Sequence, residues 1–336
     1  MITNLVIKGS ENNMSSKNKL KTTLLFAGAT TLAIHLFNKY ITQSALLNQI
    51  FKKENNTYYD SVFGKIYYKK EGSGSPVLLI HDFNLGSSSY EWAKVQDALS
   101  ETHTVYTIDL LGCGRSDKPQ MTYTNYIYVK LLTDFINHVI GEKTDLIATG
   151  ESSAFALMAS SLKSSENFGD LILVNPASIL RLSKSQAKYS KYLKKLICTP
   201  IFGTFIYNLA ASRKNITSSF KNKYYESGSK LTEREIDTYY EAAHLDQNKS
   251  KYLFSSIISG YMNVNLLFGL QQLEQNYNGQ ITILVGDSNP ENITTAEAYQ
   301  NKLNSIKIKG IPDTKHLPQL ENPQAVTSVI EELLDK

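Results

Sequence analysis

Cysteine, net charge and long apolar runs are all scarce in this chain of 336 residues. Only Cys113 and Cys198 are present, which excludes a disulfide framework or a four-cysteine zinc site and leaves room for at most one bridge. The net charge is +4, which is smaller than the basic excess typical of nucleic-acid-binding proteins. A single long apolar run excludes a polytopic membrane protein. With 42% hydrophobic and 20% charged residues, the chain is a globular protein with a large core.

The apolar run is near the N-terminus. Residues 22–37 carry no charge and lie between Lys21 and Lys39. They are fewer than the roughly 20 residues that cross a bilayer, but the flanking lysines can snorkel to its surface. We expect residues 1–53 to be a targeting segment with an uncleaved anchor, the alternative being an amphipathic helix packed on the domain. Because lysines flank the run on both sides, the side of the membrane stays open, as does a start at Met14.

Short apolar runs alternate with helix-length amphipathic stretches from residue 58 onward, which predicts an α/β fold. The pattern lapses from Pro176 to about Leu273, where helical patterns dominate. We therefore expect a core of residues 54–176 and 274–336 with a helical insertion at 177–273. The expected strands are 58–62, 65–69, 77–80, 105–108, 145–148, 171–174, 281–285 and 306–311.

The most informative motif follows the expected strand 145–148. It reads Gly150-Glu151-Ser152-Ser153-Ala154 and leads into a helix rich in small residues. A sharp strand-to-helix turn of this kind exposes a serine hydroxyl and requires small residues on both sides. The motif predicts a nucleophile elbow at Ser152, although an ordinary Gly-x-Ser turn has the same pattern.

Three further motifs each follow an expected strand. His81-Asp82-Phe83-Asn84 comes after 77–80, Asp109-Leu-Leu-Gly-Cys-Gly-Arg-Ser116 after 105–108, and His316 precedes the last helix. Together with the elbow, these motifs resemble the α/β-hydrolase family, in its serine-hydrolase and esterase-like branch, over residues 58–336. The resemblance implies a mostly parallel central sheet with helices on both faces and a helical cap.

The resemblance also implies roles for individual residues. Ser152 would be the nucleophile and His316 the general base, in the chain order that the fold uses. The backbone amides of Phe83 and Ser153 would form the oxyanion hole. Asp82 stands where the family usually has glycine, and its side chain would crowd or repel an anion near that hole.

The acid of the triad is open. In the family it sits after the strand that corresponds to 281–285, and here that position holds Asn289, with Asp287 two residues earlier. Three alternatives follow: Asp287 acts as the acid, Asn289 is a neutral partner of His316, or no acid is functional. A serine at the elbow argues against the dehalogenase and epoxide-hydrolase branches, which need an aspartate there.

The insertion, 177–273, corresponds to the family's substrate-selecting cap. Between residues 181 and 230 we count eleven lysines and arginines against one acid, Glu226. Such a surface can bind anionic lipid, and the interleaved apolar residues of 197–209 could line an acyl pocket or touch a bilayer. The alternative is a solvated basic exterior over an ordinary apolar cap core.

These features lead to one hypothesis and one alternative. The hypothesis is a membrane-anchored serine hydrolase that cleaves a carboxylic ester, lipid-derived in one version, through a Ser152 acyl-enzyme. It needs no cofactor, no metal and no nucleic acid. The alternative is a catalytically impaired pseudo-enzyme that uses the same fold to bind a small apolar ligand or a partner.

Overall fold

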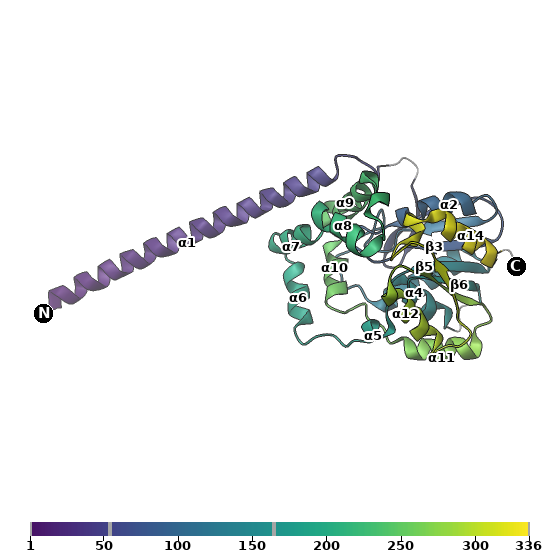
Figure 1. Ribbon diagram of the computed structural model, residues 1–336. Coiled ribbons are helices and arrows are strands. Elements are labelled where there is room, and N and C mark those ends of the chain that lie inside the picture. Colours follow the sequence, from purple (N-terminus) through teal and green to yellow (C-terminus); the bar gives the residue numbers. More distant parts are fainter. Residues whose placement is uncertain (1, 53–55, 163–165, 335–336) are drawn as a thin grey trace.

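A central eight-stranded sheet organises the computed structural model, which describes residues 2–52, 56–162 and 166–334 (Figure 1). The strand order is β1-β2-β4-β3-β5-β6-β7-β8. β1 and β2 form an antiparallel hairpin and β2 pairs antiparallel with β4, whereas all other pairs are parallel. The sheet is thus the mostly parallel one that the strand motifs predict.

The strands and helices alternate along the core and give way to helices alone between β6 and β7. The strands are β1 Thr57–Ser61, β2 Gly64–Glu71, β3 Pro76–Ile80, β4 Thr104–Ile108, β5 Thr144–Thr149, β6 Phe168–Val174, β7 Ile281–Gly286 and β8 Lys307–Ile311. The core helices are α2 Ala93–Leu99, α3 Asn125–Phe135, α4 Ser152–Ser160, α12 Pro290–Gln300, α13 Pro318–Glu321 and α14 Pro323–Leu334. The insertion contributes α5 Ile179–Leu182, α6 Ser190–Ile197, α7 Phe202–Ala210, α8 Arg213–Ser219, α9 Glu233–Asn248, α10 Lys251–Ile258 and α11 Leu266–Asn276.

Both faces of the sheet are covered, which explains the continuous apolar strands. Along β3, Val77 and Leu79 pack into the apolar cluster that contains Trp92 and the α14 residue Ile330. The alternate residues, such as Leu78, pack into the larger cluster on the opposite face, which α3 and α4 help to form. Because side chains alternate along a strand, a strand buried on both faces must be apolar throughout.

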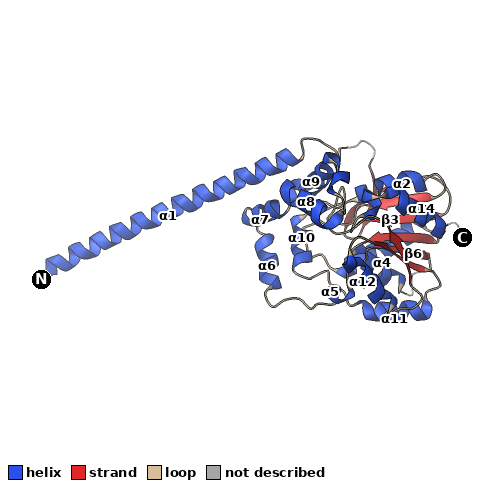
Figure 2. Ribbon diagram, in the orientation of Figure 1, coloured by secondary structure: helices blue, strands red, loops and turns tan. Residues whose placement is uncertain are grey.

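Helices α7–α10 of the insertion cover the carboxyl ends of the parallel strands, where the motif residues lie, whereas α11 packs against α4 (Figure 2). A single long helix, α1 Ile2–Ala45, projects away from the body beside α7 (Figure 1). Within it, Asn18–Ala45 is long and apolar enough to cross a membrane, a property that signal sequences share. The expected boundary between residues 53 and 54 lies outside the described residues.

Candidate active site

The turn between β5 and α4 has the sharp shape that the elbow motif predicts, but its tip is Gly150. Gly150 has φ +59°, whereas Glu151 already has helical angles and Ser152 begins α4. A left-handed backbone favours glycine, which has no Cβ to clash. The expected placement of Ser152 at the tip is therefore corrected: the tip residue carries no side chain, and Ser152 lies two residues beyond it.

Ser152 itself is fully buried. Its hydroxyl donates to the carbonyl of Thr149 at 2.7 Å, and the hydroxyl of Ser153 donates to Ala148 at 2.9 Å. Back-bonding of this kind satisfies a serine in the first turn of a helix. Among the hydrogen bonds of the described residues, none joins Ser152 to His316. The structure does not bring this expected pair together.

The space beside Gly150 is occupied by Asp82, from the loop after β3. A Cβ added to Gly150 would overlap the carboxylate of Asp82. Oδ1 of Asp82 accepts hydrogen bonds from the backbone amides of Phe83 at 2.7 Å and Glu151 at 2.8 Å. Phe83 is one of the two amides that the sequence predicts for the oxyanion hole, and Glu151 stands in place of Ser153. A built-in carboxylate thus fills this pair of amides.

The other oxygen of Asp82 pairs with His316. Oδ2 accepts from Nε2 of His316 and from the side-chain amide of Asn84, both at 2.8 Å. Burial alone would raise the pKa of Asp82, but the hydrogen bond and charge of His316, with the two amides, hold it below its ordinary value. Burial would lower the pKa of His316, and Asp82 outweighs this and raises it. Both shifts favour the charged form of their group, and together they favour an imidazolium–carboxylate pair.

The two candidates for the triad acid lie elsewhere. Asn289 caps α12, with its Oδ1 accepting from the amide of Glu291 at 3.1 Å. The exposed carboxylate of Asp287 accepts from the amide of Asp313 at 3.1 Å. Within residues 2–52, 56–162 and 166–334, no carboxylate hydrogen bonds to Nδ1 of His316. Among the described residues, neither Asp287 nor Asn289 makes the hydrogen bond to the His316 imidazole that was expected of it.

The loop of Asp82 is held by buried polar groups. Nδ1 of His81 donates to the carbonyl of Asp82 at 2.6 Å, and Nε2 accepts from the amide of Leu110 at 2.9 Å. This leaves His81 neutral and structural. The amide of Asp82 donates to Glu91, whose carboxylate also accepts from the hydroxyl of Tyr239 on α9. The site is thus fixed by contacts from both the core and the cap.

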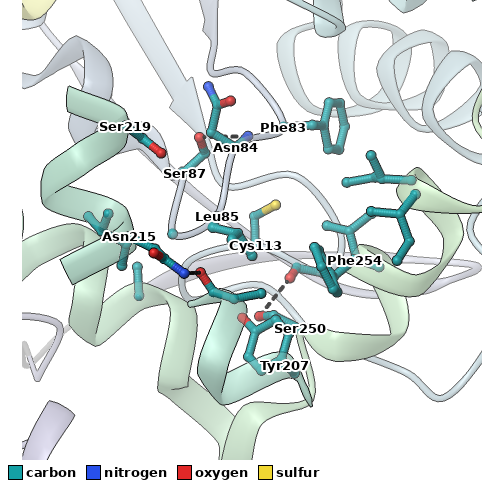
Figure 3. A pocket seen from close by; sticks show the side chains of 18 of the residues that line it. Phe83, Asn84, Leu85, Ser87, Cys113, Tyr207, Asn215, Ser219, Ser250 and Phe254 are labelled. Atoms are coloured by element: carbon teal, nitrogen blue, oxygen red, sulfur yellow. Dashed lines mark hydrogen bonds between the residues drawn. The ribbon is translucent and has the colours of Figure 1, made fainter. Parts of the chain in front are cut away.

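Two neighbouring cavities lie at this site. One, of about 580 Å³, is largely polar and is lined by Asp82, His316 and the ion pair of Glu151 with Arg181. The other, of about 380 Å³, is more apolar. Its lining includes Leu85, Phe83, Cys113, Tyr207 and Phe254 (Figure 3). Four residues line both cavities, namely Phe83, Asn84, Lys223 and Tyr224.

Neither cysteine is engaged in a bridge. Cys113 is buried and Cys198 is partly buried, and both are free thiols. Burial raises the pKa of the Cys113 thiol far above its ordinary value, so it stays protonated. The described residues also contain no group of three or more histidine, cysteine or acidic side chains that could hold a metal ion.

A comparison with known families decides what kind of protein this is. The model of the alpha/beta hydrolase family matches residues 77–329, most of the chain. The chain belongs to the alpha/beta hydrolase family. This agrees with the topology of the sheet and with the cap inserted between β6 and β7.

Individual members of the alpha/beta hydrolase family resemble parts of the chain. A 2-hydroxy-6-oxo-6-(2'-aminophenyl)hexa-2,4-dienoic acid hydrolase of Metapseudomonas resinovorans is 29% identical over 39% of this chain and 47% of its own length. A soluble epoxide hydrolase of Corynebacterium sp. strain C12 is 33% identical over 27% of this chain and 32% of its own length. The chain thus spans less than half the length of these curated relatives.

A solved structure resembles nearly the whole chain. The crystal structure of a membrane phospholipase A, described as a bacterial virulence factor, has a TM-score of 0.65 and 15% identity. It covers 95% of this chain and 98% of its own. A match that leaves out so little of the chain must include part of α1, which is 44 residues long. At this identity, the likeness shows the fold alone.

Sequence reasoning located the site but missed its central pair. Asp82 is visible in the sequence as the residue in the family's glycine position, and its crowding of the oxyanion hole is expected there. What the sequence does not give is that its carboxylate enters the hole. Gly150 supplies the missing signal, since a lone glycine at the end of a strand marks the residue with positive φ.

Proposed function

We propose that this chain is a hydrolase in which the carboxylate of Asp82, rather than a serine hydroxyl, attacks the substrate. One observation carries the proposal: the two oxygens of this carboxylate have different surroundings. Oδ1 lies on two backbone amides, whereas Oδ2 lies on Nε2 of His316 at the wall of the polar cavity. Ester cleavage through a Ser152 acyl-enzyme draws no comparable support, because the Ser152 hydroxyl is buried and bonded to a carbonyl.

The first step forms an ester between enzyme and substrate. Oδ2 of Asp82 attacks an electrophilic alkyl carbon, and the bond from that carbon to its leaving oxygen breaks. The proton on Nε2 of His316 passes to the leaving alkoxide, which leaves the imidazole neutral. The raised pKa of His316 keeps this proton available in the free enzyme.

The second step hydrolyses that ester. Neutral His316 takes a proton from a water molecule that attacks Cγ of Asp82. The negative charge of the tetrahedral intermediate falls on Oδ1, which already lies on the amides of Phe83 and Glu151. On collapse, the alkyl oxygen leaves as an alcohol with the proton from His316. The new carboxyl group then returns its own proton to His316.

This chemistry suits a strained cyclic ether that carries an alkyl chain. Ring opening releases strain and needs one proton for the alkoxide, which the imidazolium supplies. The apolar cavity beside Phe83 offers room for the chain, between Leu85 and Phe254. The epoxide hydrolase among the relatives acts on the same class of substrate, as its name states.

Ligand binding without turnover is the second candidate, and a specific contact favours it. The amide of Asn84 completes four hydrogen bonds to Asp82, so every acceptor site of the carboxylate is engaged. A fully bonded carboxylate is a weaker nucleophile. In this case the apolar cavity would hold a small apolar molecule, and the Asp82–His316 pair would only close the site.

Oxygen labelling distinguishes the candidates. The full chain, solubilised in detergent, is incubated in heavy-oxygen water with a medium-chain terminal epoxide, and the peptide that contains Asp82 is weighed. Because the attacking water leaves its oxygen in the carboxylate, we expect the label in Asp82 and a diol as product. Asp82→Asn should abolish both, whereas Asp287→Asn, the same change at an exposed aspartate, should leave both intact.

The other outcomes are equally clear. An unlabelled Asp82 with no diol, in protein that still binds an apolar fluorescent probe, would support binding without turnover. A fluorophosphonate adduct that disappears in Ser152→Ala would instead support the ester hydrolase predicted from the sequence.

A further inference from the structure

The apolar part of α1 joins the cap without a spacer. The uncharged run 22–37 ends one residue before Asn38, which is buried against the cap. The side-chain amide of Asn38 donates to the carbonyl of Ile201 at 2.9 Å and its oxygen accepts from Asn208 at 3.0 Å. One turn later, Thr42 accepts from Asn248 at 2.7 Å. A bilayer around the apolar run would therefore lie directly beside the cap.

Further contacts fix the direction of α1 relative to the cap. The rings of Phe37 and Phe205 meet edge to face at 5.5 Å. After the helix ends, the amides of Ile50 and Phe51 donate to the carboxylate of Glu241 on α9 at 2.9 and 3.0 Å. With both the helix end and the following turn held, the cap cannot swing freely about a linker.

One surface of the cap looks toward the side from which α1 projects. We call residues 184–202, with α6 at their centre, the cap face. α7 and α9 contact α1, and α6 lies beside α7 at the side of the body toward which α1 projects (Figure 1). Ile197 of α6 packs inward and is 1% exposed. The outer face of α6, in contrast, carries large apolar side chains that are exposed. The exposed large apolar and aromatic residues of the cap face are Tyr189, Tyr192, Leu193, Leu196 and Phe202, at 40 to 67%.

The charge of the cap face has one sign. Its 19 residues include five lysines, Lys184, Lys188, Lys191, Lys194 and Lys195, and no acidic residue. Two of them lie over neighbouring tyrosine rings, Lys188 over Tyr189 and Lys191 over Tyr192. Tyrosine and lysine around an exposed leucine stripe is the composition of a helix that lies in the plane of a bilayer surface.

We propose that the cap face rests on an anionic lipid surface when α1 is in the membrane. Leu193, Leu196 and Phe202 would enter the boundary of the acyl chains while the lysines contact lipid phosphates. Each basic side chain near such a surface strengthens binding by about fivefold. The resting cap would then lie beside the membrane, with its cavities a short distance from lipid.

The test uses the full chain in vesicles of phosphatidylcholine with or without phosphatidylglycerol. In a Cys198→Ser background, Tyr192→Cys and Leu196→Cys carry a fluorescent label on the cap face. Val62→Cys, on the 78% exposed turn between β1 and β2, is the control. With a quencher attached to lipid chains, we expect strong quenching at both cap positions, more with the anionic lipid, and little at the control.

A charge-matched pair of variants sharpens the result. Replacing Lys191, Lys194 and Lys195 with glutamine should lower the ratio of docked to free cap by about 100-fold. Three exposed lysines of the α/β domain outside the insertion, Lys143, Lys302 and Lys307, are the matched control. Replacing them with glutamine should leave the quenching unchanged.

Three results would overturn the proposal. If the full chain fails to sediment with vesicles, α1 does not insert into the membrane, and the proposal loses its starting point. Equal quenching at the cap face and the control would show no defined docking. Labels at the cap face that stay unquenched on membrane-bound chain, but are shielded by an added soluble protein, would assign the face to a protein partner instead.

Discussion

The loops after β3 and β7 each place an aspartate close to the end of a parallel strand, yet the two side chains differ in their burial and in their hydrogen bonds. Asp82 is 4% exposed and its carboxylate receives four hydrogen bonds, one of them from His316. Asp287, one of the three alternatives for the acid of the site, is exposed and accepts a hydrogen bond from the amide of Asp313. Donors around a carboxylate, rather than its place in a motif, decide what it can do.

The positions of the two strands explain this difference. β3 lies in the middle of the sheet between β4 and β5, so its loop is enclosed by the turn at Gly150 and by the cap. A carboxylate in such a place is stable only with a full set of donors. β7 lies next to the edge strand β8, and Asp287 in the loop after it is exposed to solvent, where a carboxylate needs no protein partner.

The largest change in reactivity is expected when the carboxylate of Asp82 is removed and a serine hydroxyl is placed at residue 150. In the double variant Asp82→Gly with Gly150→Ser, the two amides are vacated and a hydroxyl stands at the tip beside His316. We expect a serine that reacts with a fluorophosphonate, where the native chain shows no adduct at residue 150. Intact-mass analysis followed by peptide mapping measures it.

The single variant Gly150→Ser is the matched control. Its Cβ would overlap the Asp82 carboxylate, and its backbone would keep the positive φ that only glycine adopts freely. We expect a loss of stability and no adduct. An adduct on the single variant would show that Asp82 leaves the oxyanion hole readily, which contradicts a fixed carboxylate.

Breaking the Asp82–His316 pair gives the next largest effect, and it depends on pH. The lowered pKa of Asp82 contributes stability that is present above its unfolded value and is lost as pH falls through the folded value. The raised pKa of His316 contributes stability that is present below its unfolded value and is lost as pH rises through the folded one. Asp82→Asn should therefore lower the free energy of unfolding by the largest amount, about 3 kcal/mol, between about pH 4 and pH 6.5.

Chemical denaturation of both proteins across this range measures the difference, and NMR of the His316 ring should show a lower pKa in the variant. Asp134→Asn, which removes the partner of Lys130 on α3, is the control for an ion pair lost outside the site and should lower the free energy of unfolding by no more than about 1 kcal/mol. A cost that stays constant from acid to alkaline pH would mean that Asp82 acts through packing alone.

The sequence predicts the fold well because the fold follows from patterns that are local along the chain. The apolar runs 77–80 and 281–285 correspond to β3 and β7 almost residue for residue. The insertion is visible as the place where strands stop. All these features depend on the periodicity of side chains within one segment.

The candidate site could be predicted only in outline, because its chemistry depends on distances between segments. The sequence puts Asp82 and His316 at the same edge of the sheet, but 234 residues separate the two hydrogen-bonded side chains. Whether the carboxylate turns toward Gly150 or toward solvent depends on packing by Glu91 and the cap. The elbow motif misleads by two residues, since the serine that matches it belongs to the first turn of α4.

The smallest effect is expected at Asp287, which stands two residues before the family's acid position. Its carboxylate is exposed and, among the described residues, accepts hydrogen bonds from Ser288 and Asp313. Asp287→Asn keeps an oxygen to accept the Asp313 amide, so the free energy of unfolding should change by no more than about 0.5 kcal/mol. The NMR titration of His316 should be unchanged. A downward shift in the His316 pKa would mean that Asp287 reaches the imidazole, and the two loops would then share one function.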